Sequence, residues 1–194
     1  SYIEWKKIVT CSIDDHENML WSQYCADHPI MQMAKLCFDN VSPWDFWSVS
    51  KFYPDLVKHL HLQVRLVGNF PFNGGIPWLF NTDGSLCFIC KQSVEDINHF
   101  LFVCPRFQGN FDTLWSKLYQ KILSFNPTDG IQICNFIRNL DFTHKGQLML
   151  GGLKLPFDRD TNTMIIRFVS SAIGKIYKIR SEVLREMEAP WITL

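Results

Sequence analysis

The stretch that decides the fold is Cys87–Pro105, which reads CFICKQSVEDINHFLFVCP. Its spacing is C-x2-C-x8-H-x4-C, with candidate metal ligands at Cys87, Cys90, His99 and Cys104. A Cys-x2-Cys turn directs two thiolates to one ion, and a third thiolate with an imidazole completes a tetrahedron. Sulfur donors with one nitrogen favour zinc over calcium or magnesium. Four protein ligands leave no position for water, so we predict one structural zinc ion.

Local helix signals surround the second pair of ligands. Ser93 followed by Asp96 resembles a capping box, which predicts a short helix from near residue 94 that carries His99. Pro105 disfavours continuation of that helix past Cys104. The alternative is an ordinary core in which free cysteines pack as small hydrophobic side chains. Four other cysteines stand among apolar neighbours and are predicted to be buried thiols: Cys11, Cys25, Cys37 and Cys134.

Helical patterns extend on both sides of this stretch. Residues 1–10 show no clear period, whereas Asp14–Asn40 is helical with a break at Pro29. His59–Val67 fits a strand or a helix, and we predict a helix. Residues 68–86 combine glycines and prolines with aromatics that need burial, which predicts an ordered aromatic loop. The chain therefore divides into a helical segment 1–67, the loop with its zinc module at 68–106, and a helical segment 107–194.

The last long helix is predicted from about Thr161 to Glu188. One apolar stripe is formed by Ile165, Val169, Ala172, Ile176, Ile179 and Val183. Roughly opposite lie the basic residues Arg167, Lys175, Lys178 and Arg185. Two interpretations remain: a solvated charged face, or a face that follows a phosphate backbone.

Composition bounds the class of protein. The chain has 194 residues, and no apolar run approaches the ~20 residues of a membrane span. Nineteen basic and nineteen acidic residues balance, but residues 1–104 carry a net charge of −4 and residues 105–194 a net charge of +4.

Seven cysteines without a secretory signal favour a reducing, intracellular compartment over a disulfide framework. We predict a mainly α protein: a helical domain with a small CCHC zinc-knuckle-like module and an ordered aromatic loop.

The metal motif resembles the zinc-binding module on the C-terminal side of non-LTR (long interspersed) retrotransposon reverse transcriptases. That module reads C-x2-C, then an acidic residue three before the His, then H-x-[LF]-F-x-C-P. The matching positions here are Asp96, His99, Leu101, Phe102, Cys104 and Pro105. The segment 68–73 resembles the upstream family motif Arg-Thr-Gly-His-x-x-Leu-Asn, with Leu66 at the place of its Arg and Asn69 at that of its His. The resemblance covers roughly residues 65–106.

The resemblance implies a non-catalytic region that helps hold template RNA or target DNA in target-primed reverse transcription. Its partners would be nucleic acid and the polymerase portion of the same polyprotein, in the nucleus and cytoplasm, with no membrane or small-molecule substrate. Candidate nucleic-acid contacts are Lys91 in the zinc loop, Arg106 just after it, Arg65, and the basic face of the last helix.

No catalytic motif accompanies this module in the sequence. A polymerase needs paired carboxylates on a hairpin to hold magnesium, whereas Asp14-Asp15 precedes a polar run that resembles a helix start. Leu155–Asp160 is expected to end a loop rather than to form a nuclease site. His59 and His61 lack accompanying ligands and are expected to be solvated. The chain is therefore predicted to be a non-enzymatic fragment of an RNA-directed DNA polymerase. A rival hypothesis is a zinc-stabilised protein-interaction module, kept as a domesticated retrotransposon remnant.

Overall fold

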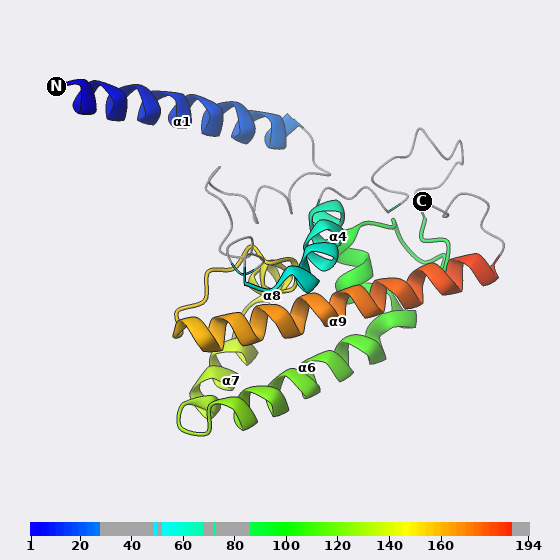
Figure 1. The fold of residues 1–194 in the computed structure, drawn as a ribbon. Helices are drawn as coiled ribbons and strands as arrows, with labels where there is room; N and C mark the ends of the chain where they lie inside the picture. Colours follow the sequence, from blue (N-terminus) through cyan, green and yellow to red (C-terminus); the bar gives the residue numbers. More distant parts are fainter. Residues whose placement is uncertain (28–48, 50–51, 68–71, 73–85, 188–194) are drawn as a thin grey trace.

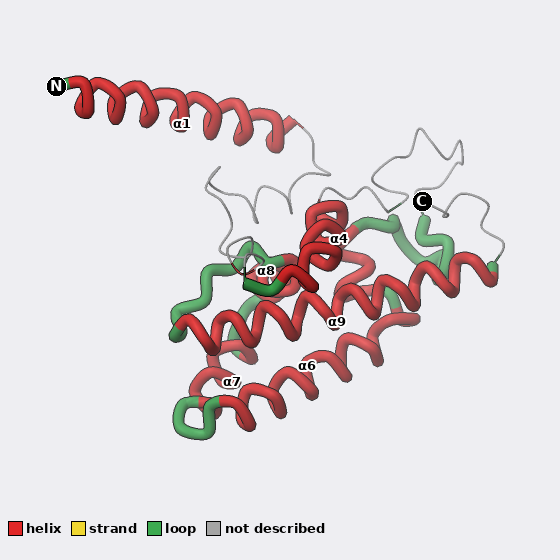
Figure 2. Tube along the Cα trace, viewed as in Figure 1, coloured by secondary structure: helices red, strands yellow, loops and turns green. Residues whose placement is uncertain are grey.

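The computed structural model describes residues 1–27, 49, 52–67, 72 and 86–187, and every regular element among them is helical (Figure 2). The elements are α1 (Tyr2–Asp27), η2 (Pro54–Leu56), α4 (Val57–Val67), η4 (His99–Val103), α6 (Pro105–Phe125), α7 (Gly130–Arg138), α8 (Phe142–Leu150) and α9 (Arg159–Glu186). The predicted mainly α class is confirmed, and His59–Val67 is helical as expected. No helix in these ranges is long and apolar enough to cross a membrane.

Helix α9 is the central element of the helical core. It packs along α6 on one side and against α4 and α8 on the other (Figure 1). Its interior side chains include Ile165, Val169 and Ile173, all fully buried. Burying one such side chain contributes roughly 1.5–3 kcal/mol, so the stripe on α9 holds the surrounding helices together.

The buried stripe on α9 departs from the predicted one near its C-terminal end. Ile165, Val169 and Ile176 are buried as predicted, but Ile179 is 37% exposed. Its neighbour Arg180 takes the interior place instead, because its guanidinium has a buried carboxylate partner there. The interior of α9 therefore changes from aliphatic to ionic where the helix meets the metal motif.

Helix α9 begins two residues earlier than predicted and ends at Glu186. The Asp158 carboxylate caps its first turn by accepting hydrogen bonds from the backbone N–H groups of Asp160 and Thr161, each at 2.9 Å. Leu155–Asp160 thus ends a loop before the final helix, as expected. Helix α6 likewise starts with Pro105 at its first position, where a missing N–H costs nothing.

The first helix corrects one expectation, the burial of Cys11. Residues 2–10 are helical together with the following turns, so α1 is one continuous helix of 26 residues. In Figure 1 it projects away from the helical core. Because it packs no face against that core, no burial period marks its first turns. For the same reason Cys11 is exposed, not buried as predicted, whereas Cys134 on α7 is buried as expected.

Part of the predicted aromatic loop belongs to the core. Phe72 is fully buried, and its ring lies 5.5 Å from that of Phe100. The Phe100 ring also meets Phe107 and Phe111 at 5.4 and 5.6 Å, so it joins the loop to α6. Several predicted features lie outside the described residues: the other loop aromatics, the helix after Pro29 with Cys37, and the side chain of Cys25.

Candidate metal centre

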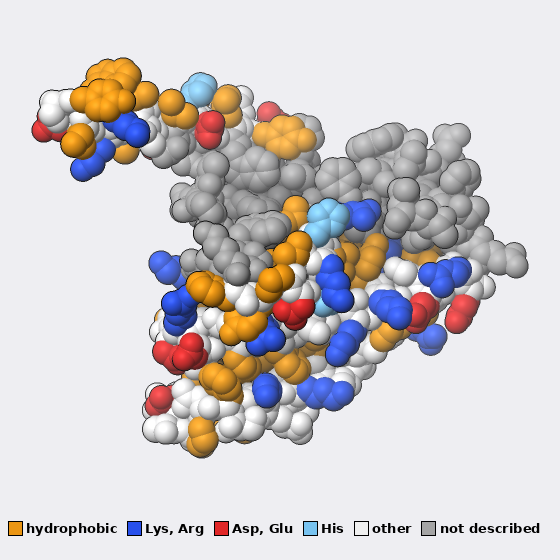
Figure 3. All heavy atoms as spheres, viewed as in Figure 1, with side chains coloured by type: hydrophobic (Ala, Val, Ile, Leu, Met, Phe, Trp, Pro, Cys, Tyr) orange, Lys and Arg blue, Asp and Glu red, His pale blue; other side chains and the backbone are white. Residues whose placement is uncertain are grey.

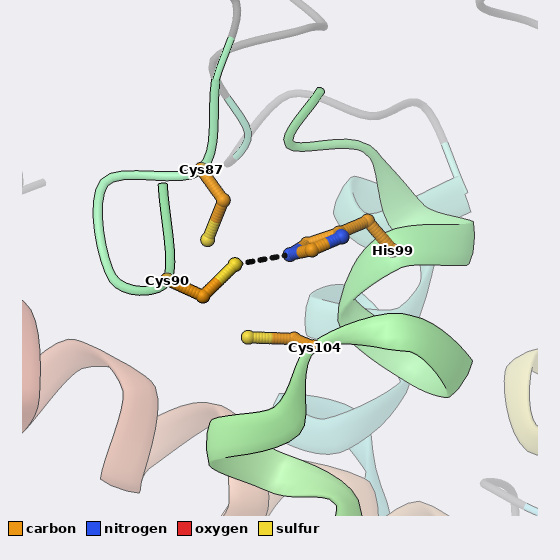
Figure 4. A group of neighbouring side chains, drawn as sticks. All are labelled: Cys87, Cys90, His99 and Cys104. Atoms are coloured by element: carbon orange, nitrogen blue, oxygen red, sulfur yellow. Dashed lines mark hydrogen bonds between the residues drawn. The ribbon is translucent and has the colours of Figure 1, made fainter. Parts of the chain in front are cut away.

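The four predicted ligands converge on one point. Their ligand atoms, three Sγ atoms and one imidazole nitrogen, all lie within 4.8 Å of one another. In a tetrahedral centre with metal–sulfur bonds near 2.3 Å, neighbouring sulfurs are ~3.8 Å apart, so metal capture needs movements of only ~1 Å. Figure 4 shows Cys87 and Cys90 entering from one turn, His99 from a helix and Cys104 from the helix exit. The centre can hold one metal ion.

The first two ligands are held by a tight backbone turn, Cys87–Lys91, which we call the knuckle turn. Lys91 N–H donates to the Cys87 carbonyl at 2.9 Å, and Cys87 N–H donates to the Ser93 carbonyl at 2.8 Å. An antiparallel bridge between Leu86 and Val94 closes the base of the turn. Lys91 has φ 60°, a left-handed conformation that costs a non-glycine residue roughly 1–2 kcal/mol. The hydrogen bonds fix the turn in the shape that places both thiols on one side.

The helix that carries His99 starts later than the capping-box pattern predicts. The Asp96 carboxylate, not the Ser93 hydroxyl, accepts the hydrogen bond from a helix N–H, that of His99, at 2.7 Å. Asp96 is therefore the cap, and the helical residues begin at Ile97. The Ser93 hydroxyl is unavailable for capping because it lies 2.6 Å from His99 Nδ1.

The spacing between the last two ligands is accommodated by a π-helix. Cys104 N–H donates to the His99 carbonyl at 2.7 Å, a bond five residues back along η4. This wider turn brings the residues at both ends of H-x4-C to the same side of the helix. Cys104 then adopts an extended conformation, with ψ 113°, and α6 begins at the next residue. A regular α-helix through Cys104 would direct its thiol elsewhere.

The imidazole of His99 is oriented by contacts at both ring nitrogens. Nε2 lies 3.2 Å from Cys90 Sγ and therefore faces the other ligands, whereas Nδ1 meets the Ser93 hydroxyl. When Nε2 binds a metal, Nδ1 carries the proton and donates it to Ser93 Oγ, the usual outer contact of a metal-bound histidine. The Ser93 hydroxyl is thus placed to accept the Nδ1 proton when Nε2 is a ligand.

Burial sets the protonation of the centre before a metal binds. It raises the pKa of the Cys87 thiol to about 12, and the nearby Glu95 carboxylate adds to that rise. Burial also raises the pKa of the Cys104 thiol and lowers the pKa of His99 below its ordinary 6.5. At neutral pH these two thiols are protonated and the imidazole is neutral. A bound cation must therefore displace protons from both thiols.

A buried ion pair next to the centre was not predicted from the sequence. Arg180 of α9 donates to Glu95 Oε1 from Nη2 at 2.6 Å and from Nε at 3.3 Å, and both side chains are almost fully buried. The same carboxylate oxygen lies 3.9 Å from Cys87 Sγ. No local sequence pattern joins two residues 85 positions apart, so the pair is evident only in the structure.

The predicted nucleic-acid contacts do not form a single cluster. Six of them are exposed: Lys91, Arg106, Arg167, Lys175, Lys178 and Arg185. Arg65, in the last turn of α4, is half-buried. Three have close neighbours: Arg167 lies 4.0 Å above the Tyr53 ring, Lys91 lies 5.0 Å above the Phe88 ring, and Lys178 pairs with Glu182 at 3.7 Å.

The residues considered in the sequence as possible polymerase or second-metal ligands do not belong to the metal cluster. Asp14 and Asp15 are within α1, and the Asp15 side chain is exposed. His61 is exposed, and His59 is half-buried against α9. Among the described residues the CCHC cluster is the one group of three or more metal-ligating side chains close enough to share an ion.

Comparison with known proteins gives no relative from which an activity can be transferred. No family model matches the chain, and neither does any curated protein or solved structure.

Proposed function

We propose that the chain is a non-catalytic, zinc-binding and nucleic-acid-binding region of a non-LTR retrotransposon reverse transcriptase. In this role it would hold template RNA or target DNA beside the polymerase portion during target-primed reverse transcription. The observation that carries the proposal is the meeting of Cys87, Cys90, His99 and Cys104 at one centre. These are the positions of the motif that resembles this family.

Zinc is the metal that best suits this donor set. Three thiols and one imidazole are soft to borderline ligands, which disfavour magnesium and calcium. The four ligands come entirely from protein and lie within 4.8 Å of one another, and four protein ligands are typical of structural zinc sites. The proposed ion therefore stabilises the fold and takes no part in a reaction.

Exposed cations beside the metal centre support binding to a polyanion. Arg106 stands in the first turn of α6, two residues after Cys104. Lys178 and Arg185 flank Arg180, whose buried guanidinium reaches Glu95 in the metal motif. These exposed cations therefore gather at the metal end of the molecule, where phosphate contacts would be sequence-independent.

Salt-dependent binding of fluorescent RNA and DNA oligonucleotides tests the proposal. Three or four phosphate contacts should give a slope of about −2 to −4 for log affinity against log salt. Lys175→Glu with Lys178→Glu should weaken binding for every sequence and flatten the slope, whereas Lys145→Glu with Lys154→Glu should leave both unchanged. Primer extension on an RNA template with magnesium should stay at background. Undetectable binding at low salt would refute nucleic-acid binding and favour a protein-interaction module.

A further inference from the structure

A long groove runs along the surface between α6 and α9. Its volume is about 740 Å³, and its walls extend from Asn110 to Phe125 on α6 and from Asp160 to Ile179 on α9. At 1.5 Å per residue, the α6 wall alone is ~22 Å long. Figure 3 shows this face with hydrophobic side chains between the two helices and basic side chains along both.

The floor of the groove is apolar and its rims are basic. The floor includes Leu114, Met164 and Phe168. Lys117 and Lys121 line the α6 side, and other lining cations, Arg167 and Lys175, come from α9. Two carboxylates, Asp55 and Asp160, also line the groove, so its lysines and arginines outnumber its acids. An apolar floor between two basic rims fits an amphipathic helix with acidic side chains beside its apolar stripe.

A single nucleic-acid strand fits the groove less well than such a helix. Strand binding without sequence preference relies on aromatic faces on which bases stack. Aliphatic side chains outnumber the aromatic ones in the lining, which are Tyr53, Phe125 and Phe168, and the ring of Tyr53 is already covered by the Arg167 guanidinium at 4.0 Å. A strand would also place its one backbone along a single rim, whereas this groove offers cations on both.

The chain itself contains a helix that exposes many apolar side chains and carries the opposite charge, although these side chains are spread over more than one face. Large hydrophobic side chains of α1 are about half to three-quarters exposed: Tyr2, Ile3, Trp5, Ile8, Ile13, Met19, Leu20 and Tyr24. At 100° per residue Trp5, Ile13 and Leu20 fall on one side of the helix. The segment has five acidic and two basic residues, opposite in sign to the groove. Its 26 residues span ~39 Å, more than the length of the groove.

We infer that the groove between α6 and α9 binds helix α1 of a second copy of this chain. The contact buries the exposed apolar stripe of α1 on the groove floor and sets acidic side chains such as Asp15 and Glu17 against Lys117 and Lys121. Two copies that exchange α1 reciprocally form a closed dimer, because each then fills the groove of the other. This inference is independent of the proposed nucleic-acid function.

Sedimentation velocity of the full chain, across the micromolar range and at two salt concentrations, tests the inference. The wild type should associate as its concentration rises, and salt should weaken that association. Lys117→Glu with Lys121→Glu should weaken it about tenfold or more, since two attractive contacts become repulsive. The matched reversal of Lys145 and Lys154 to Glu, neither of which lines the groove, should have no effect. Circular dichroism verifies that each variant is folded.

A charge exchange makes the test specific to α1. Asp15→Lys with Glu17→Lys should weaken self-association of the wild-type background. The same two changes should restore it when combined with Lys117→Glu and Lys121→Glu.

Three results would overturn the inference. The first is a wild-type chain that stays monomeric at every concentration. The second is association that is indifferent to reversal of Lys117 and Lys121 or is not restored by the charge exchange. The third is loss of oligonucleotide binding on that reversal without any self-association, which would assign the groove to a nucleic-acid strand. Lys178 does not line the groove, so loss of oligonucleotide binding on Lys178→Glu alone tests the nucleic-acid proposal and not this one.

Discussion

Arg180 and Glu95 form a buried ion pair at 2.6 Å that fastens the last helix to the metal motif. The Glu95 oxygen that accepts from Arg180 also lies 3.9 Å from the thiol of Cys87. The pair therefore links the interior of α9 to the outer contacts of the candidate centre.

Removing one partner of this pair should be strongly destabilising. Arg180→Met leaves the Glu95 carboxylate buried without its cation, which typically costs about 3–5 kcal/mol in the free energy of unfolding. Adding Glu95→Gln should recover part of the loss, because no unpaired charge then remains. Urea denaturation measures all three proteins. Lys178→Ala, which breaks only an exposed pair with Glu182, should cost less than about 1 kcal/mol and serves as the control.

The purified chain should contain one zinc ion, measured by elemental analysis. Structural zinc in small modules contributes an apparent ~10–16 kcal/mol, so chelation should unfold at least residues 86–104. Cys104→Ser should lose the metal, whereas Cys11→Ser, at an exposed thiol on α1, should retain it. A folded chain that holds no zinc would disprove the assignment.

Zinc binding should release at least two protons at pH 7. Burial raises the pKa of Cys87 to about 12 and also raises the pKa of Cys104, so both thiols lose a proton only when the metal binds. His99 contributes none, because burial lowers its pKa and leaves it neutral. Affinity should therefore fall about 100-fold or more for each unit that pH drops below neutrality. Calorimetry in buffers of different ionisation enthalpy counts the protons, and a value below two would contradict this account.

Gly174 of α9 should not tolerate a methyl group. A Cβ there would lie 2.4 Å from Nδ1 of His59, so the ring must move although alanine is the better helix former. We expect Gly174→Ala to cost about 1–3 kcal/mol in unfolding free energy. His59→Ala should remove that penalty when both changes are combined.

The control for this change is another helical glycine. Gly109 of α6 has no atom within 4 Å of the position that a Cβ would occupy. Gly109→Ala should therefore stabilise the chain by about 0.5–1 kcal/mol, which urea denaturation would show. Equal effects at Gly109 and Gly174 would rule out the steric explanation.

The sequence predicts the metal centre well because its determinants are local. Four ligands within eighteen residues, with a Cys-x2-Cys turn and a proline at the exit, define the cluster before any tertiary contact is known. The cap was misassigned to Ser93 because Ser93 and Asp96 both suit a helix start. Only the position of the His99 ring shows that Ser93 serves the imidazole and Asp96 the helix.

Tertiary relationships account for what the sequence did not predict. Arg180 shares its helix with five exposed cations, and its burial depends on Glu95, far away in the chain. The apolar residues in the first turns of α1 have no clear period. The helix packs no face against the helical core, so burial does not impose one. The groove between α6 and α9 arises from the packing of two helices, and neither helix alone shows it.

The knuckle turn and π-helix also have a consequence for the order of folding. Their ligands enclose a loop of eighteen residues, whereas the Glu95–Arg180 contact closes one of 85. The entropy lost on closing a flexible loop grows with its length, so the short loop closes at the lower cost. On the ribosome, the residues of the centre also emerge well before Arg180. A nascent chain in a zinc-containing cell can thus complete its metal centre first and use it as the surface on which α9 later docks.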